Sequence, residues 1–486
     1  MSTLKQKTIS GFLWSFTDFA SKQLISFVIG IILARLLLPR EFGLIGMITI
    51  FIAISTSFIN SGFGTALIRK SDCTSEDYST VFYFNLVVGI LFYLVLFFTS
   101  DAISRYFNEP QLTKILRVLS IVLIIDSLTI IQRTILIKRV DFKLQTKISV
   151  ISSIISGSIG ITMAFTGFGV WSLVGKQIIQ RITNSLLLWL WNRWRPILVF
   201  SRKSFIELFS FGYKLLLVSL MATMYNNVYY FLIGRYFSAT DLGYYTRADQ
   251  FSKLASTSLI SIVSQVSFPV LAQMQDDKIF LKENFKKISM SVMLISFVVM
   301  IGMATIAEPM IITLIGEKWR ESIVYLQLLC IAGIMYPLNL LNLQILNVFG
   351  RSDLVLRLEI IKILLAVPII VTGVYIGISA MIVGLIIHGL AAFFISSTWS
   401  GKFINYSAWE QVLDIIPSFL LVVTSFLLVY LIGIMLPINY LPKLIVQVFF
   451  GGLITLFLCE ITRLKSYLLL KQVIQNKIKD ILESRK

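Results

Sequence analysis

The chain has 486 residues, of which 57% are hydrophobic and 14% are charged, and its formal net charge at pH 7 is +18. A soluble globular protein has about 25% charged residues, so this composition excludes a soluble fold and indicates a protein that crosses a membrane many times. The excess of Lys and Arg is therefore expected on cytoplasmic loops and not at a nucleic-acid site.

The first predicted element is an apolar helix within residues 11–43, GFLWSFTDFASKQLISFVIGIILARLLLPREFG. It is long enough to span a bilayer, because ~20 residues at ~1.5 Å each cross the ~30 Å hydrocarbon core. No small-residue cleavage site follows a short apolar core, so we expect no signal peptide. The helix carries Asp18 and Lys22 inside the span, which is costly in lipid and points to a transport pathway.

The hydropathy pattern predicts an all-α polytopic membrane protein with about 14 transmembrane helices. No connection between them is long enough to form a separate domain. The expected spans are residues 11–38, 42–66, 81–100, 114–137, 148–166, 169–190, 208–234, 246–274, 287–308, 321–348, 354–376, 378–398, 413–436 and 440–461.

The end of the first span recurs two hundred residues later. ARLLLPREFG at 34–43 corresponds to GRYFSATDLG at 234–243, and LRVLSIVLIIDSL at 116–128 resembles LQLLCIAGIMYPL at 326–338. The glycines that end the first pair, Gly43 and Gly243, are expected in turns that need a positive φ. The repeat predicts two parallel, pseudo-symmetric six-helix lobes, residues 1–200 and 201–400, with two additional helices in 401–462 and a tail in 463–486.

The distribution of basic residues predicts the orientation. Most of the 43 Lys and Arg lie in segments on the same side as the N-terminus. By the positive-inside rule both termini face the cytoplasm, as an even number of spans requires. The basic, aromatic segment at 191–205 is expected at the membrane interface, and the tail is expected to form an amphipathic helix on the cytoplasmic membrane surface.

Ionisable residues inside the spans are the candidate site. Basic residues outnumber acidic ones there, which favours an anionic substrate such as a diphosphate, since Lys and Arg donate charge-assisted hydrogen bonds to phosphate oxygens. One interpretation is a cationic cavity whose charge neighbouring carboxylates adjust or use to carry a coupling ion; the other is internal salt bridges that ease insertion. The candidate substrate-binding residues are Lys22, Arg181, Lys214, Arg133, Lys253 and Lys176, and the candidate charge-adjusting residues are Asp18, Asp126 and Asp249.

Other potential chemistry is sparse. Cys73, Cys330 and Cys459 are far apart and form no CxxC motif, so neither a disulfide framework nor a metal site is predicted. His388 lies in an apolar stretch and is expected to be a packed or polar-contact histidine and not a functional one. No GxxxxGK[ST] motif occurs, so we expect no cofactor and no ATP-driven step.

Several stretches resemble the polysaccharide-exporter branch of the multidrug/oligosaccharidyl-lipid/polysaccharide (MOP) superfamily. They are ILARLLLPREFGLIGM, FINSGFGTALIRK, FNEPQLTKILRVLS, LIGRYFSATDLGYYTRADQF and LIGEKWRESIVYLQLL. The resemblance covers essentially the whole chain. It is closest to the Wzx-type flippases that serve O-antigen, capsule, colanic acid or teichuronic acid export.

This resemblance implies that the chain is a flippase and not an enzyme. The family moves undecaprenyl-diphosphate-linked oligosaccharide from the inner to the outer leaflet of the bacterial cytoplasmic membrane by alternating access between two lobes. In related lipid II flippases basic residues on the first helix of a lobe line the cavity, and Lys22 and Lys214 occupy similar helices. The partners implied are the lipid-linked substrate, membrane lipid, and polymerase and chain-length machinery.

Two alternatives remain open. An ion-coupled multidrug or cation antiporter of the same superfamily would use Asp18 and Asp126 as its cation site. A membrane polymerase or glycosyltransferase would need a sizeable outer loop with catalytic residues, and the predicted outer loops are short.

Overall fold

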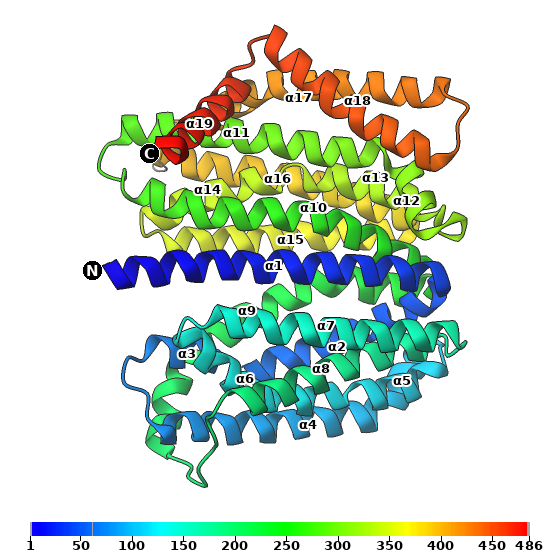
Figure 1. Ribbon diagram of the computed structural model, residues 1–486, viewed down its shortest axis with the longest axis vertical. Coiled ribbons are helices and arrows are strands. Elements are labelled where there is room, and N and C mark those ends of the chain that lie inside the picture. Colours follow the sequence, from blue (N-terminus) through cyan, green and yellow to red (C-terminus); the bar gives the residue numbers. More distant parts are fainter. Residues whose placement is uncertain (1, 61, 484–486) are drawn as a thin grey trace. The chain divides into compact units, whose positions relative to one another are not determined.

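The computed structural model describes residues 2–60 and 62–483, with only some of the side chains in residues 2–36, 239–272 and 465–483. The described chain is helical, with no strand in those ranges. It forms two compact units, residues 1–246 and 247–486. Figure 1 shows long helices lying side by side within each unit. The prediction of an all-α fold is therefore confirmed.

The described residues of unit 1 form nine complete helices and the start of a tenth. They are α1 (Ser2–Leu36), α2 (Pro39–Asn60), α3 (Phe63–Arg69), α4 (Ser75–Phe107), α5 (Gln111–Leu119), α6 (Ile121–Lys138), α7 (Phe142–Phe165), α8 (Val170–Trp191), α9 (Arg202–Tyr236) and the first residues of α10 (Ala239–Ala272). Here α1 packs on α7, α7 on α8, α8 on α6 and α6 on α4, while α9 packs on α2, α3 and α4.

Unit 2 contains the remainder of α10 and the helices that follow. They are α11 (Lys278–Thr305), α12 (Ala307–Ile315), the 3₁₀ turn η1 (Glu317–Trp319), α13 (Ser322–Gly333), α14 (Tyr336–Val348), α15 (Ser352–Ile376), α16 (Ile378–Ile404), α17 (Ala408–Met435), α18 (Tyr440–Ile461) and α19 (Lys465–Glu483). Here α15 packs on α16, α17 on both α11 and α18, and α19 on α11.

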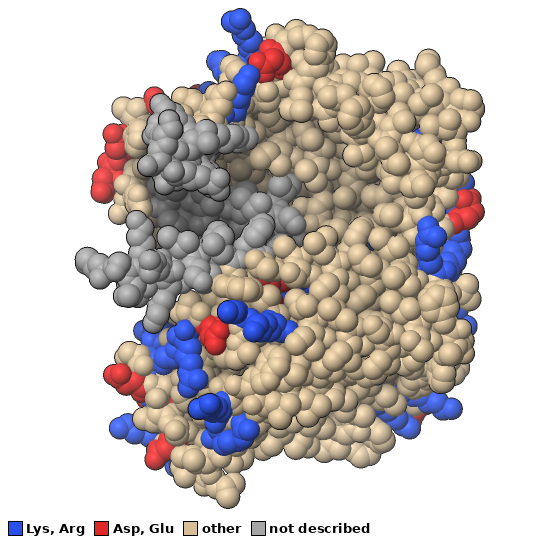
Figure 2. All heavy atoms as spheres, in the orientation of Figure 1, with Lys and Arg blue, Asp and Glu red and all other residues tan. Residues whose placement is uncertain are grey.

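Ten helical segments among the described residues are long and apolar enough to cross a membrane, so the chain is a multi-pass membrane protein. The other four predicted spans fall on α1, α8, α10 and α15, which are helical and each carry at least two ionisable residues. Figure 2 shows most charged side chains of the visible face toward its left and right, with a broad uncharged surface between them. The count of 14 spans stays a prediction.

The sequence repeat has a structural counterpart at the starts of α2 and α10. The Glu41 carboxylate accepts a hydrogen bond from the backbone N–H of Leu38 at 2.6 Å, and the Asp241 carboxylate accepts one from that of Ser238 at 3.2 Å. Each acid thus satisfies a backbone donor that the first helical turn leaves without a partner. The two halves of the sequence therefore begin their second helix in the same way.

The glycines of the repeat meet inside unit 1. A Cβ on Gly43 would lie 1.6 Å from the carbonyl oxygen of Ala239, and a Cβ on Gly243 would lie 1.9 Å from that of Pro39. The contact is reciprocal, because Pro39 and Ala239 are two hundred residues apart, as the glycines are. Both glycines are helical and neither has a positive φ, so the expectation of turn glycines is wrong. Close approach of two backbones is what excludes a side chain here.

Two further segments named from the sequence, the basic, aromatic segment at 191–205 and the C-terminal tail, can be compared with the structure. Residues 192–201 of unit 1 are non-helical and contact α4, where the Ile197 and Ser201 N–H groups donate to the Ser79 and Thr80 hydroxyls. The tail forms the helix α19, whose Ser466 hydroxyl hydrogen-bonds to α17, and its position on the cytoplasmic membrane surface stays a prediction. Residues 484–486 lie outside the described residues. The lobe boundary at residue 200 stays a prediction, because the contacts divide the chain after Thr246.

Candidate functional site

The first charged pair lies on α1. The Lys22 ammonium lies 2.5 Å from the Asp18 carboxylate one turn earlier. The lysine side chain is 41% exposed, whereas that of Asp18 is 14% exposed and its Oδ1 atom is buried with no hydrogen-bond partner among the described residues. The basic side chain of this pair is therefore more accessible than the acidic one.

The second pair joins two helices. The Arg181 guanidinium of α8 lies 3.3 Å from the Asp126 carboxylate of α6, with the arginine 47% exposed and the aspartate 13% exposed. Sequence spacing found no acidic neighbour for Arg181, because its partner is more than fifty residues away along the chain. As in the pair on α1, the basic side chain is accessible and the acidic side chain is mostly covered.

A third base connects these pairs. The exposed Arg133 side chain of α6 interacts electrostatically with Arg181, Asp126 and, from α1, Asp18. We name the residues Asp18, Lys22, Asp126, Arg133 and Arg181 the unit-1 charge cluster. It holds three bases and two acids, and every base in it is more accessible than the acids. The Arg133 guanidinium also lies 3.5 Å from the side-chain oxygen of Asn184 on α8, a residue that the sequence analysis did not single out.

Small residues on α7 bring α1 and α8 to this position. A Cβ on Gly157 would lie 2.1 Å from the Ile29 side chain of α1, and a Cβ on Gly160 would lie 2.9 Å from the Cβ of Lys176 on α8. Small residues allow membrane helices to approach closely, so α7 packs tightly against both α1 and α8, which carry charged residues of the cluster. The sequence showed these glycines but gave no means of knowing which helices they face.

The remaining predicted residues lie elsewhere. Lys253 of unit 2 lies 2.7 Å from Asp249, with exposed fractions of 51% for the lysine and 9% for the aspartate. Lys214 of α9 is exposed, and its ammonium has no carboxylate partner among the described residues. Lys176 is partly buried where α8 meets α7. Substrate binding by these three lysines stays a prediction.

His388 is a buried residue that makes a polar contact with the backbone of α15. A nitrogen of its ring hydrogen-bonds to the backbone carbonyl of Lys362 at 2.9 Å, which ties α16 to α15. No group of three or more His, Cys, Asp or Glu side chains that could hold a metal occurs within the described residues. The histidine therefore behaves as the sequence predicted.

A separate ion-pair network closes one end of unit 1. The Lys70 ammonium lies 3.1 Å from Asp77 at the start of α4 and 3.2 Å from Glu207 at the start of α9. Burial acts to lower the pKa of Lys70, but hydrogen bonds and charges from both carboxylates outweigh it and raise the pKa above its usual value. Nearby, the Lys138 ammonium contacts the Cys73 thiol at 3.0 Å. These contacts join α3, α4, α6 and α9.

Comparisons with known proteins identify relatives by sequence. Residues 32–324 match a family model described as "Polysaccharide biosynthesis protein". The chain is 28% identical to the teichuronic acid biosynthesis protein TuaB of Bacillus subtilis (strain 168), over 61% of this chain and 62% of TuaB. It is 27% identical to the lipopolysaccharide biosynthesis protein WzxC of Escherichia coli (strain K12), over 76% of each chain.

Solved structures with the same fold are more distant in sequence. The lipid II flippase MurJ in an inward closed conformation superposes with a TM-score of 0.71 at 14% identity, over 93% of this chain and 98% of MurJ. An inward-facing multidrug resistance MATE family transporter of the MOP superfamily superposes with a TM-score of 0.62 at 14% identity, over 79% of this chain and 96% of the transporter. At these identities the likeness shows the fold alone.

Proposed function

The chain belongs to the polysaccharide biosynthesis protein family and has the fold of the MOP superfamily, and from this premise we propose that it is a flippase for lipid-linked oligosaccharide. The substrate would be an oligosaccharide on undecaprenyl diphosphate. It would move from the inner to the outer leaflet of the bacterial cytoplasmic membrane by alternating access, for surface polysaccharide biosynthesis. Both termini would face the cytoplasm.

The observation that supports this proposal most is the difference in accessibility between the basic and the acidic side chains of the unit-1 charge cluster. Its three basic side chains are accessible, while the two carboxylates beside them are mostly covered. A ligand that approaches therefore meets cations first. The diphosphate of a polyprenyl carrier needs such groups, because hydrocarbon cannot solvate it and Arg can bind phosphate oxygens with two parallel hydrogen bonds.

The acids have a supporting role in this mechanism. Without Asp18 and Asp126, the three bases would repel one another inside the membrane, where an unpaired charge costs ~2.5 kcal/mol or more. With them, each of two bases keeps one partner and still has donors free for phosphate. After release of the substrate, Lys22 and Arg181 are then still paired with Asp18 and Asp126. Either acid could also carry the coupling ion.

Other residues would extend the path. Lys214, Lys176 and Lys253 would contact the charged head before or after the cluster does, and Asp249 would adjust the charge of Lys253. The polyprenyl tail would stay in lipid. Polymerase and chain-length machinery would receive the transported oligosaccharide.

The test is translocation of a labelled undecaprenyl-diphosphate oligosaccharide in proteoliposomes. Wild type should move the lipid, Lys22→Ala should lower the rate at least about tenfold, and Lys22→Arg should largely restore it, because one hydrogen bond to a charged group is worth about 1.5–3 kcal/mol. Lys402→Ala serves as the control, since Lys402 is exposed at the end of α16. An unchanged rate for Lys22→Ala would contradict the role of the cluster.

The same vesicles distinguish the antiporter. A wild type that moves no lipid-linked saccharide but exchanges organic cations for protons would replace the flippase proposal, with Asp18 and Asp126 as the cation site. The covered position of both carboxylates argues for the flippase, because an organic cation is much larger than a coupling ion and needs accessible anions.

A further inference from the structure

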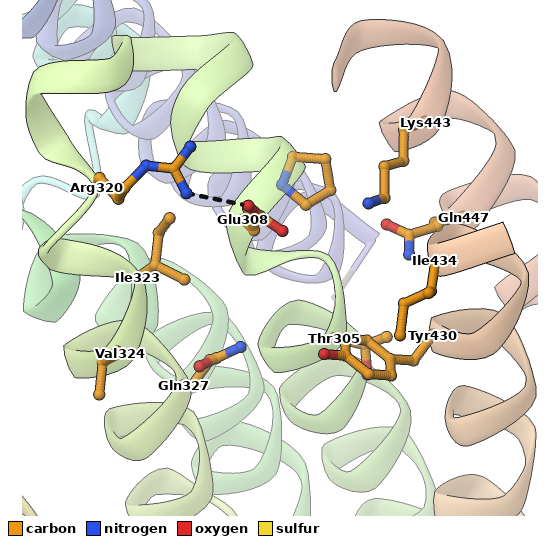
Figure 3. Close-up of a pocket in the computed structure, with 11 residues that line it drawn as sticks. Thr305, Glu308, Arg320, Ile323, Val324, Gln327, Tyr430, Ile434, Lys443 and Gln447 are labelled. Carbon is orange, nitrogen blue, oxygen red and sulfur yellow. Dashed lines mark hydrogen bonds and ion pairs between the residues drawn. The ribbon is translucent and has the colours of Figure 1, made fainter. Parts of the chain in front are cut away.

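A polar cavity of ≈ 240 Å³ lies in unit 2, at the end of the bundle opposite α19. Two groups of helices form it, α12 with η1 and α13 on one wall and α17 with α18 on the other. Figure 3 shows Arg320 and Glu308 on the first wall, and Lys443 and Gln447 on the second. Helices α17 and α18 follow the sequence repeat, so nothing in unit 1 corresponds to this second wall.

The first wall is held rigidly. Gly316 ends α12 with a φ of 98°, which allows the tight η1 turn, and Trp319 in that turn is fully buried. Arg320 follows at once, and its guanidinium contacts Glu317 at 2.5 Å and Glu308 at 3.3 Å. The arginine is thus fixed at the cavity edge with its charge largely compensated.

The second wall carries polar groups that lack partners. The Gln447 side chain is 2% exposed, and its Oε1 atom is buried with no hydrogen-bond partner among the described residues. Its Nε2 atom reaches the Val429 carbonyl only at 3.5 Å. Lys443, one turn earlier on α18, lines the same cavity and has no carboxylate within ion-pair distance in the part of the chain that the structure describes.

A glycine makes room for both groups. A Cβ on Gly433 of α17 would lie 2.0 Å from the Gln447 Nε2 atom and 3.3 Å from the Lys443 Cε atom. An unsatisfied buried acceptor costs about 1–3 kcal/mol. The packing therefore maintains an acceptor without a hydrogen-bond partner and a cation without a carboxylate partner among the described residues.

We propose that this cavity binds an anionic group flanked by hydroxyls. The Lys443 ammonium would hold the anion, while Gln447 Oε1 and the Glu308 carboxylate would accept hydrogen bonds from the hydroxyls. The Tyr430 side chain also lines the cavity and offers an apolar ring face. Two sources have this chemistry, an acidic sugar of the transported oligosaccharide and the phosphoglycerol headgroup of a membrane lipid.

The acidic sugar is the source that fits the rest of the molecule. The inference rests on the proposed function: if both termini are cytoplasmic, this end of α17 and α18 lies on the outer side, where the oligosaccharide leaves. The cavity would then hold one sugar of the product during release.

The experiment is a ligand-detected NMR titration of the full-length protein in phosphatidylcholine nanodiscs. The probes are glucuronic acid, glucose and glycerol 1-phosphate. Wild type should bind glucuronic acid at least tenfold more tightly than glucose, and Lys443→Met should lose that preference, because one charge-assisted hydrogen bond accounts for a factor of about ten or more. Lys443→Arg should retain it. Gly433→Ala should weaken binding by displacing both side chains, and Lys402→Met should change nothing.

Each outcome decides a different point. Binding of glycerol 1-phosphate but not glucuronic acid, lost in Lys443→Met, keeps the anion site and assigns it to lipid. No binding of either probe, or equal binding by Lys443→Met, overturns the site. Translocation is scored separately: a wild type that moves lipid-linked saccharide but binds neither probe overturns only this site. A wild type that binds but moves no lipid overturns the proposed function.

Discussion

Replacing Gly43 by alanine should destabilise unit 1, because the added Cβ would lie 1.6 Å from the carbonyl oxygen of Ala239. Ordinary contact begins at 3.4 Å, so two helix backbones would have to separate by about 2 Å. Overpacking a core costs about 1–3 kcal/mol when side chains can adjust. Here only backbone can move, so we expect about 3 kcal/mol or more.

The assay is thermal unfolding of the purified protein in detergent. A loss of about 3 kcal/mol corresponds to a fall in Tm of roughly 6–12 °C for a unit of this size. Gly243→Ala should behave alike, because its contact with Pro39 is the reciprocal one. The double variant should lose less than the sum of the two single losses, since one separation relieves both clashes.

Gly452→Ala is the matched control, because a Cβ at that helical position would meet no atom within 4 Å. Its Tm should stay close to that of wild type. A Gly43→Ala protein with an unchanged Tm and normal transport would refute the argument that backbone contact at this crossing excludes a side chain.

Two further predictions concern the charge cluster and the orientation. Arg181→Met should lower the translocation rate at least about tenfold. Adding Asp126→Asn should restore the folding yield but not transport, because the double variant removes the unpaired acid without replacing the phosphate donor. Full transport by the double variant would show that the pair is purely structural. A membrane-impermeant maleimide should label Cys73 from the cytoplasmic side only. Cys330 and Cys459 are buried and should stay unlabelled in the folded protein. Labelling of Cys73 from outside would show that the predicted orientation is wrong.

The apolar runs were sufficient to predict helices, because a segment that crosses lipid must satisfy its backbone hydrogen bonds internally. The predicted span at 81–100 lies inside α4, and that at 440–461 matches α18. The acids of the repeat, Glu41 and Asp241, could also be recognised from sequence, since a cap acts on the nearest backbone N–H groups.

Which charges meet is a matter of tertiary structure. Asp18 and Lys22 share one helix, and their pairing follows from a spacing of four residues. Asp126 and Arg181 lie on different helices, and only the packing of α6 against α8 brings them within 3.3 Å. Periodicity identifies neighbours within a helix and carries no information about neighbours between helices.

The same limit applies to the glycines and to the cavity of unit 2. The sequence by itself determined a helical membrane protein with a half-chain repeat and basic residues within its spans. Tertiary structure decided that Gly43 is required by a helix crossing, and that Gly433 leaves room for Gln447 and Lys443. It also decided that the bases are more accessible than their partner acids. The physical reason is that burial and close approach depend on distances between segments far apart in the chain, which no local pattern of residues encodes.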